Sequence, residues 1–308
     1  MKINPRAKID RSQVQDRRGQ RSRGFPMPGG RGGGGGLPIP AGGGIGGIIL
    51  VIVILVVASQ CGGLSMPGGS DSNSSAQQLE ECRTGADAAK DETCLLNLFA
   101  NVIQTFWADK LPGQADVKYV EADTVFLTDS TDSGCGQATS AMGPFYCPAD
   151  KLVYLDPTFF KDMLQGELGA KGGPFAEGYV VAHEYGHHVQ DLLGTMQKAQ
   201  SGETGPTSPS VRLELQADCY AGIWAHYATT VKDDSGEVFI TDLTDEDIKL
   251  AIDAAKAVGD DRIQQRTQGN INEEQWTHGS SAERIHWFMT GYQKGQLDSC
   301  DSFAANAL

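Results

Sequence analysis

Basic side chains are scarce in this sequence after Arg31. The whole chain carries 25 Lys and Arg against 39 Asp and Glu, which gives a net charge of −14. The range 1–31 holds nine basic and two acidic side chains, so the rest of the chain carries a net charge of −21. An acidic body disfavours nucleic-acid binding, which requires a basic surface. We expect the basic residues in the range 1–31 to set the membrane topology or to contact anionic lipid.

The sequence also lacks any C-x-x-C pair and any internal repeat. Without such a pair, a cysteine-ligated metal is disfavoured. Seven cysteines are present, Cys61 and six further along, and this even number of six is typical of disulfides formed in an oxidising compartment. Six cysteines allow 15 pairings, and buried free thiols are the alternative for some of them. Because two local pairs have identical spacing, the pairing we predict is Cys82 with Cys94, Cys135 with Cys147, and Cys219 with Cys300.

Long hydrophobic runs are absent except for one. No residue is charged between Ala41 and Ser59, and residues 45–58 are nearly all Ile, Val and Leu with glycines at the start. This run approaches the length of a bilayer-spanning helix, and a helix buried in a soluble core is the alternative. A cleaved signal peptide fits less well because a long stretch of chain precedes the run. Lipoprotein cleavage before Cys61 fits less well because Gln60 is not small.

These features predict five segments along the chain. They are a basic cytoplasmic tail (1–28), a Gly- and Pro-rich linker (29–44), a transmembrane helix (45–60), a flexible stalk (61–78) and a folded domain (79–308). Basic residues before the span predict a cytoplasmic N-terminus. The folded domain would then lie outside the cytoplasm, in an extracellular or periplasmic location, which agrees with its cysteine content.

Apolar periodicity in residues 79–308 predicts mainly helices with short strands among them. Apolar side chains recur at helical spacing in residues 95–107, and Pro112-Gly113 would close that helix. Residues 117–127 and 143–156 have the composition of strands, and residues 146–155 could present an edge to an extended peptide. Further helices are expected at residues 157–164, 175–193, 209–229, 244–264 and 282–292.

The helix at residues 175–193 contains the pattern H-E-x-x-H. His183 and His187 are four residues apart and therefore lie on one face of the helix, where both can bind one zinc ion. Glu184 is placed to reach a zinc-bound water as general base. A helix with surface histidines is the alternative interpretation.

Two histidines leave a catalytic zinc short of a third protein ligand. The metzincin extension is excluded because Gln190 and Leu193 occupy the positions where its glycine and third histidine would stand. Another solution is a glutamate on a following helix, and Glu214 fits this pattern. Asp218, four residues further, can accept the second ring proton of a ligand histidine. A solvated Glu214, or a salt bridge to a nearby basic residue, is the alternative.

Other histidines and one arginine are candidates for supporting roles. His188 cannot share the metal with His187, because adjacent helical residues point about 100° apart. His226 and His286 are surrounded by aromatic residues, and we expect structural roles for them. His278 precedes the last helix and could donate to the oxyanion of a tetrahedral intermediate, or merely cap the helix. Arg284 could anchor the carboxylate of Glu214 or Asp218.

Four stretches carry a resemblance to a known family. They are H-E-Y-G-H-H-V-Q at 183–190, L-E-L-Q-A-D-C-Y-A-G at 213–222, T-H-G-S-S-A-E-R at 277–284, and the opening N-P-R-A-K-I-D-x-S-Q-V-Q-D-R-R-G at 4–19. Together with one span, they resemble the bacterial family of putative neutral zinc metallopeptidases. More distantly, the chain is similar to membrane-type gluzincins, which implies His183, His187 and Glu214 as zinc ligands and Glu184 as base. Those enzymes usually have His-Pro where this chain has His278-Gly279.

The sequence therefore predicts an α+β fold, in which a mainly helical zincin-like metallopeptidase domain with a small β-sheet beside the metal helix follows one transmembrane helix. The expected function is a membrane-anchored zinc metalloendopeptidase with one Zn²⁺ per chain, acting on a peptide or protein substrate. Its expected partners are that substrate and the lipid bilayer, with no nucleic acid. The alternatives are a proteolytically inactive metal-binding scaffold or chaperone, and a zinc amidase acting on a non-peptide or cell-wall substrate.

Overall fold

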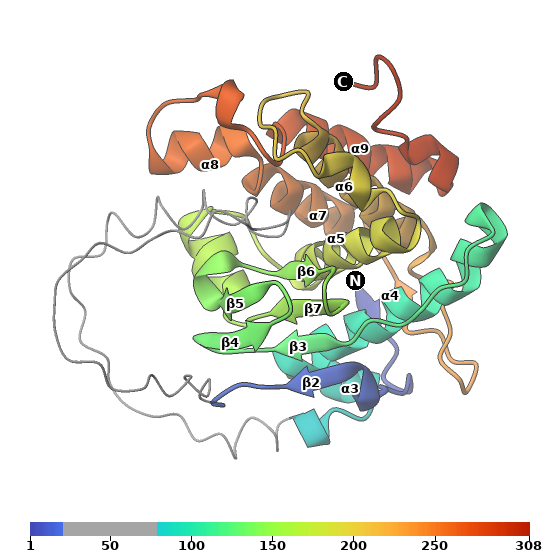
Figure 1. Ribbon diagram of the computed structural model, residues 1–308. Helices are drawn as coiled ribbons and strands as arrows, with labels where there is room; N and C mark the ends of the chain where they lie inside the picture. Colours follow the sequence, from blue (N-terminus) through green and yellow to red (C-terminus); the bar gives the residue numbers. More distant parts are fainter. Residues whose placement is uncertain (21–78) are drawn as a thin grey trace, which may run out of the picture.

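The computed structural model describes residues 1–20 and 79–308, which form a mixed α+β fold (Figure 1). Helices dominate and several small sheets lie to one side of them. The helices are α3 (Gly85–Ala88), α4 (Glu92–Ala115), α5 (Pro174–Leu192), α6 (Pro209–Tyr227), α7 (Asp245–Ala257), α8 (Asp260–Thr267) and α9 (Ser281–Lys294), with a π-helix, η4 (Phe160–Glu167). Short 3-10 turns are η1 (Arg11–Gln13), η3 (Ser140–Met142), η5 (Met196–Ala199), η6 (Glu273–Gln275) and η7 (Leu297–Cys300).

The largest sheet has four strands in the order β2-β3-β7-β6. Its β2–β3 and β3–β7 pairs are parallel, and β7 pairs antiparallel with β6, which forms one edge. Two further sheets are the β4–β5 hairpin and the antiparallel pair β1–β8. The strands are β1 (Lys2–Ile3), β2 (Val14–Asp16), β3 (Thr124–Phe126), β4 (Ser130–Ser133), β5 (Gly136–Thr139), β6 (Phe145–Cys147), β7 (Leu152–Leu155) and β8 (Ile240–Asp242).

Helix α5 lies at the centre of the core, in contact with α4, α6, α7 and β6. It begins with Pro174, whose fixed φ suits the first helical position, and Gly194 follows its end in the left-handed conformation that glycine favours. Its residues 175–190 are all buried. Close packing of α6 against α9 depends on Gly222 and Gly291, since a Cβ at either would collide with the backbone of the other helix.

Most expected helices are present, with different ends. Helix α4 passes through Pro112 and ends only at Ala115, where Asp116 adopts the left-handed conformation with φ 55°. The helix expected at 157–164 is instead η4, because Asp156 holds a turn by accepting the N–H of Thr158 (2.9 Å). The single helix expected at 244–264 is two, α7 and α8, because the extended residue Gly259 breaks it.

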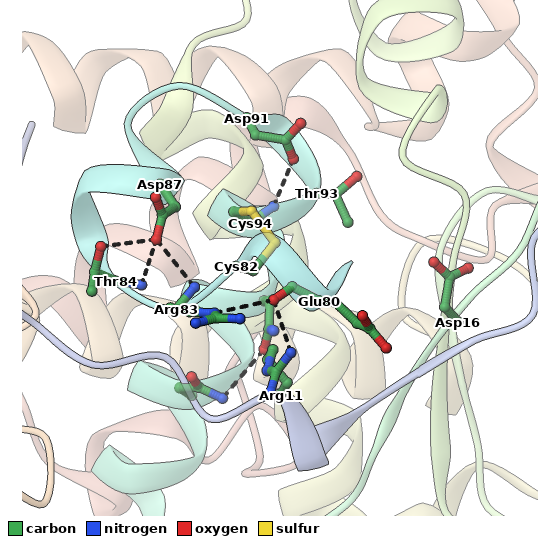
Figure 2. Close-up of a disulfide and its surroundings, with 12 residues drawn as sticks. Arg11, Asp16, Glu80, Cys82, Arg83, Thr84, Asp87, Asp91, Thr93 and Cys94 are labelled. Atoms are coloured by element: carbon green, nitrogen blue, oxygen red, sulfur yellow. Dashed lines mark hydrogen bonds between the residues drawn. A yellow bond between two sulfur atoms is a disulfide. The ribbon is translucent and has the colours of Figure 1, made fainter. Parts of the chain in front are cut away.

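The three disulfides are those predicted: Cys82–Cys94, Cys135–Cys147 and Cys219–Cys300. Figure 2 shows the first of them, which joins the start of α4 to the chain before α3. Within the range 117–127, where one strand was expected, only the short strand β3 forms. The apolar run at 143–156 forms β6 and β7.

Residues 1–20, which the sequence assigned to a separate cytoplasmic tail, pack on the folded domain through β1 and β2. The predicted linker, transmembrane helix and stalk lie within residues 21–78, outside the described residues. Of the helices that the structure describes, none has the length and apolar character required to cross a bilayer.

Candidate active site

Helices α5 and α6 bring three metal-binding side chains together. The Nε2 atom of His183 lies 3.1 Å from Glu214 Oε2, and the Nε2 atom of His187 lies 3.4 Å from Glu214 Oε1. One ligand atom from each residue lies within 4.8 Å of the others, and all three residues are buried. Gly186 permits this approach of the helices, since a Cβ there would lie 3.0 Å from the backbone oxygen of Ala217.

The donor set fits a catalytic zinc. Two imidazoles and one carboxylate supply three ligands and leave a fourth position for water or substrate. The surrounding charge agrees with a cation at this point. Burial alone would lower the pKa of His183, but Asp218 and Glu214 raise it to about 10. Burial would also raise the pKa of Glu214, yet its two histidine neighbours hold it well below the usual range. Negative charge that stabilises a proton on a histidine stabilises a metal ion in the same place.

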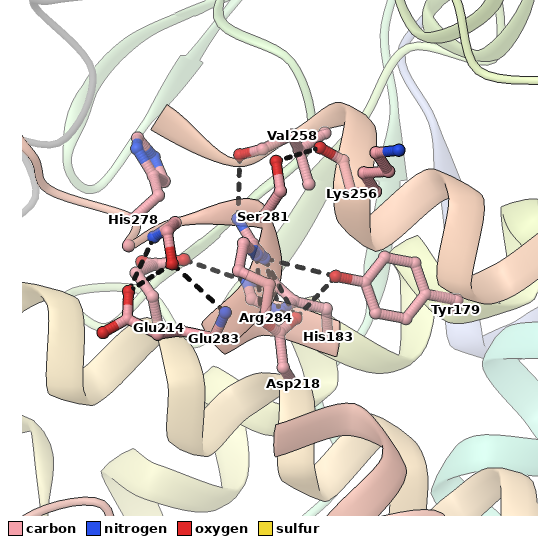
Figure 3. Close-up of polar contacts among 12 residues, drawn as sticks. Tyr179, His183, Glu214, Asp218, Lys256, Val258, His278, Ser281, Glu283 and Arg284 are labelled. Atoms are coloured by element: carbon pink, nitrogen blue, oxygen red, sulfur yellow. Dashed lines mark hydrogen bonds and ion pairs between the residues drawn. The ribbon is translucent and has the colours of Figure 1, made fainter. Parts of the chain in front are cut away.

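Asp218 and Arg284 support His183 from the side away from the ligand cluster (Figure 3). His183 Nδ1 lies 2.9 Å from Asp218 Oδ1, which can accept its proton and orient the ring. Arg284 donates to both oxygens of Asp218, from Nε at 2.8 Å and from Nη2 at 2.9 Å. Tyr179 donates its hydroxyl proton to Asp218 Oδ1 at 2.5 Å. Of the two carboxylates considered for Arg284, the geometry selects Asp218.

Glu184 and His278 line the same cleft as the three ligand candidates. Glu184 is buried, and burial raises its pKa above the usual range despite the neighbouring histidines. His278 is oriented by Asp260, whose Oδ1 lies 3.1 Å from His278 Nδ1. The other oxygen of Asp260 accepts the backbone N–H groups of Thr277, His278 and Gly279. One carboxylate therefore fixes both the loop and the ring of His278.

Comparison with known proteins agrees with this geometry. The model of a family described as putative neutral zinc metallopeptidase matches residues 3–303. The chain belongs to this family. An uncharacterized protein of Mycobacterium tuberculosis H37Rv, Rv2575, is 51% identical over 228 residues, which are 74% of this chain and 76% of that protein. The uncharacterized protein YpfJ of Escherichia coli K12 is 44% identical over 190 residues, 60% of this chain and 62% of that protein. No solved structure matches.

The zinc metallopeptidase family implies zinc as the metal for this site. Both relatives are described as uncharacterized, so the family identifies the kind of site and leaves the substrate open.

A cleft of about 290 Å³ has His183, His187 and Glu214 in its lining. Edge strand β6 borders it through Phe145 and Tyr146, and η4 and α8 contribute to its walls. The apolar side chains of the lining include Met142, Pro144, Phe159, Met163, Leu168, Val258 and Ile263. Of the two strands that cover the predicted range 146–155, β6 (Phe145–Cys147) is the edge strand, since β7 lies between β3 and β6.

His187 has a partner that the sequence analysis missed. Gln190, three residues further along α5, places its Oε1 atom 2.8 Å from His187 Nδ1. The Nε2 atom of Gln190 donates to the backbone oxygen of Leu213 (2.7 Å) and to Gln216 on α6 (3.1 Å). The only sequence signal was the i, i+3 spacing from His187, which places both side chains on one face.

The remaining histidines do not join the metal-binding cluster. His188 is buried, and its Nε2 donates to the backbone oxygen of Val120 (2.6 Å) while its Nδ1 lies 3.1 Å from the Tyr146 hydroxyl. It therefore ties α5 to edge strand β6, and it lies outside the cluster of His183, His187 and Glu214, as the angle between adjacent helical residues led us to expect. His226 and His286 are exposed and lie outside the cleft lining.

Proposed function

We propose that this family member is a zinc-dependent metalloendopeptidase, in which His183, His187 and Glu214 hold one Zn²⁺. The convergence of both imidazole Nε2 atoms on the Glu214 carboxylate carries this proposal. Asp218 and Gln190 bind the second nitrogen of each histidine and so fix which nitrogen is free for the metal.

Bound zinc supplies a Lewis acid and lowers the pKa of its water toward neutrality. Glu184, with its raised pKa, accepts a proton from the attacking water and returns it to the leaving amine. His278 donates a hydrogen bond to the developing oxyanion, and Asp260 holds it ready for that role. These assignments for Glu184 and His278 belong to the proposal.

An extended peptide is the substrate that the cleft accommodates best. Strand β6 ends the four-stranded sheet, so one side of its backbone is free to pair with a further strand. The apolar walls beside it can receive uncharged side chains. A cell-wall amide lacks the regular backbone that such an edge pairs with, and we therefore place the amidase second.

We propose that the protein is associated with a membrane through its apolar run and acts outside the cytoplasm. The apolar run at residues 45–58 supports the membrane association, and the three disulfides support the location, since disulfides persist in oxidising compartments.

Replacing the general base tests the mechanism directly. In the full-length chain, Glu184→Gln should retain zinc and lose at least about two orders of magnitude in the rate of cleavage of an unfolded protein such as casein. The measurements are zinc content by elemental analysis and initial cleavage rates, with Glu203→Gln in the exposed loop before α6 as the matched control.

Four outcomes test the mechanism and separate the candidate functions. Full activity in Glu184→Gln contradicts the mechanism. Stoichiometric zinc without proteolysis in the unaltered chain favours the inactive scaffold, and cleavage of cell-wall amides alone favours the amidase. Activity abolished by a chelator and restored by Zn²⁺ supports the peptidase.

A further inference from the structure

The first residues of the chain run along the segment that the Cys82–Cys94 disulfide holds (Figure 2). Ile9 donates its N–H to the Arg83 backbone oxygen (3.0 Å), and Gly85 donates to the Ala7 backbone oxygen (2.8 Å). Arg11 donates from its guanidinium to the Glu80 backbone oxygen (2.9 Å). The beginning of the chain is thus paired through its backbone with a segment closed by a disulfide.

Five residues of this N-terminal segment (1–20) are buried in the domain. Asn4, Ala7, Ile9, Gln13 and Val14 are each at most 8% exposed. Strand β2 pairs in parallel with β3 and so forms the edge of the four-stranded sheet opposite β6. At the other end of the segment, β1 pairs antiparallel with β8, which follows α6 far along the chain. These contacts are interior contacts of one domain.

Buried polar groups of the domain depend on this segment. Asn101 of α4 is 3% exposed, and its amide accepts the N–H of Asp10 (2.8 Å) and donates to the Asp10 backbone oxygen (2.9 Å). The same amide donates to Gln13 (2.9 Å). Without residues 1–20, Asn101 would lose these partners, and leaving a buried polar group unpaired is costly.

We infer that residues 1–20 lie on the same side of the membrane as residues 79–308 and fold with them as one domain. A chain that crosses a bilayer once has its two flanks on opposite sides. Exchange of the segment between two copies would not alter this, because all copies insert in the same direction. A single crossing of the bilayer between these two parts of the chain is therefore incompatible with their contacts, and residues 1–20 lie in the compartment in which the disulfides form instead of in the cytoplasm. This inference does not depend on peptidase activity.

Cross-linking in the full-length chain tests the packing. Lys2 and Asp242 are Cα partners in the β1–β8 pair, and both side chains are exposed. Antiparallel partners lie within the Cα distance that a disulfide spans. In a Cys61→Ser background, Lys2→Cys with Asp242→Cys should form an intramolecular disulfide that peptide mass mapping detects. The control pair, Lys2→Cys with Gln137→Cys of the separate β4–β5 sheet, should not.

Labelling of the two single variants tests the topology even where the double variant folds poorly. A membrane-impermeant maleimide should modify both Lys2→Cys and Asp242→Cys in cells with an opened envelope, and should modify neither in inverted vesicles, where the face outside the cytoplasm is enclosed. Labelling from opposite sides overturns the inference. Loss of residues 1–20 from the mature protein, or a folded double variant that does not cross-link, overturns it as well.

Discussion

At the scale of single residues, the proposed zinc site gives the hydrogen-bond partners of its two histidines a role in metal affinity. Gln190 is the polar partner of His187 Nδ1, at 2.8 Å, and is fully buried. Gln190→Ala should lower zinc affinity by roughly tenfold or more, because the ring loses the acceptor that orients it. Competition with a zinc-binding dye measures this. Gln265→Ala, an exposed glutamine of α8 outside the cleft lining, is the control, and equal affinities of the two variants would contradict the role of Gln190.

The pairing of His278 with Asp260 predicts how the peptidase activity depends on pH. Burial favours the neutral imidazole, but the Asp260 carboxylate outweighs it and raises the pKa of His278. The protonated donor therefore persists to higher pH than in a free histidine, and is lost as pH rises through the pKa of the folded protein. Asp260→Asn removes the negative charge and lowers that pKa. The alkaline limb of the kcat/KM profile should move to lower pH, and an unchanged limb would show that His278 is not the proton donor, since the cap of α9 is Ser280.

At the scale of elements, α5 carries a buried carboxyl group that is not one of the three metal-ligand candidates. Glu177 is 8% exposed and lies close to Glu92 of α4, and burial, reinforced by Glu92, raises its pKa from 4.5 to about 8. Between these values the folded protein binds a proton that the unfolded chain does not, so this group lowers stability as pH rises from 4.5 to 8 and has no effect on stability below that range.

Glu177→Gln should remove this dependence. We expect the variant to be about 2–4 kcal/mol more stable than the unaltered chain at pH 8 and no more stable at pH 4. Urea unfolding at the two pH values measures the difference. Glu92→Gln, at an exposed position, should give a smaller gain, and a gain for Glu177→Gln that is equal at both pH values would refute the explanation.

Elements differ in how far the sequence could predict them. The periodicity of residues 175–193 and 209–229 predicted α5 and α6, and the spacing of His183, His187 and Glu214 predicted the cluster that these helices form. Asp260 escaped prediction because it meets His278 only through the approach of separate elements. Gln190 lies on the same helix as His187, but its orientation depends on Leu213 and Gln216 of α6, which no local pattern reveals. Strand β2 is very short and pairs in parallel with a strand that is distant in the sequence, and no local pattern reveals such a contact.

At the scale of the whole molecule, the N-terminal segment completes the sheet whose far edge borders the cleft. Residues 1–20 supply β2, which covers β3, and β3 is tied to the metal helix because the hydroxyls of Thr124 and Tyr185 lie 2.9 Å apart. Loss of the segment would expose apolar surface around Ile9 and Val14 and deprive Asn101 of its partners Asp10 and Gln13. The stability of the site therefore depends on the start of the chain.

Deletion of residues 2–20 from the full-length chain should lower its free energy of unfolding by at least about 3 kcal/mol, from lost apolar burial and the unpaired Asn101. Thermal unfolding followed by circular dichroism measures the change, and a synthetic peptide of residues 1–20 added to the truncated chain should recover part of it. A peptide in which Ile9 and Val14 are both replaced by Asp is the control and should not restore stability. A truncated chain with an unchanged unfolding midpoint would show that the segment lies on the domain without stabilising it.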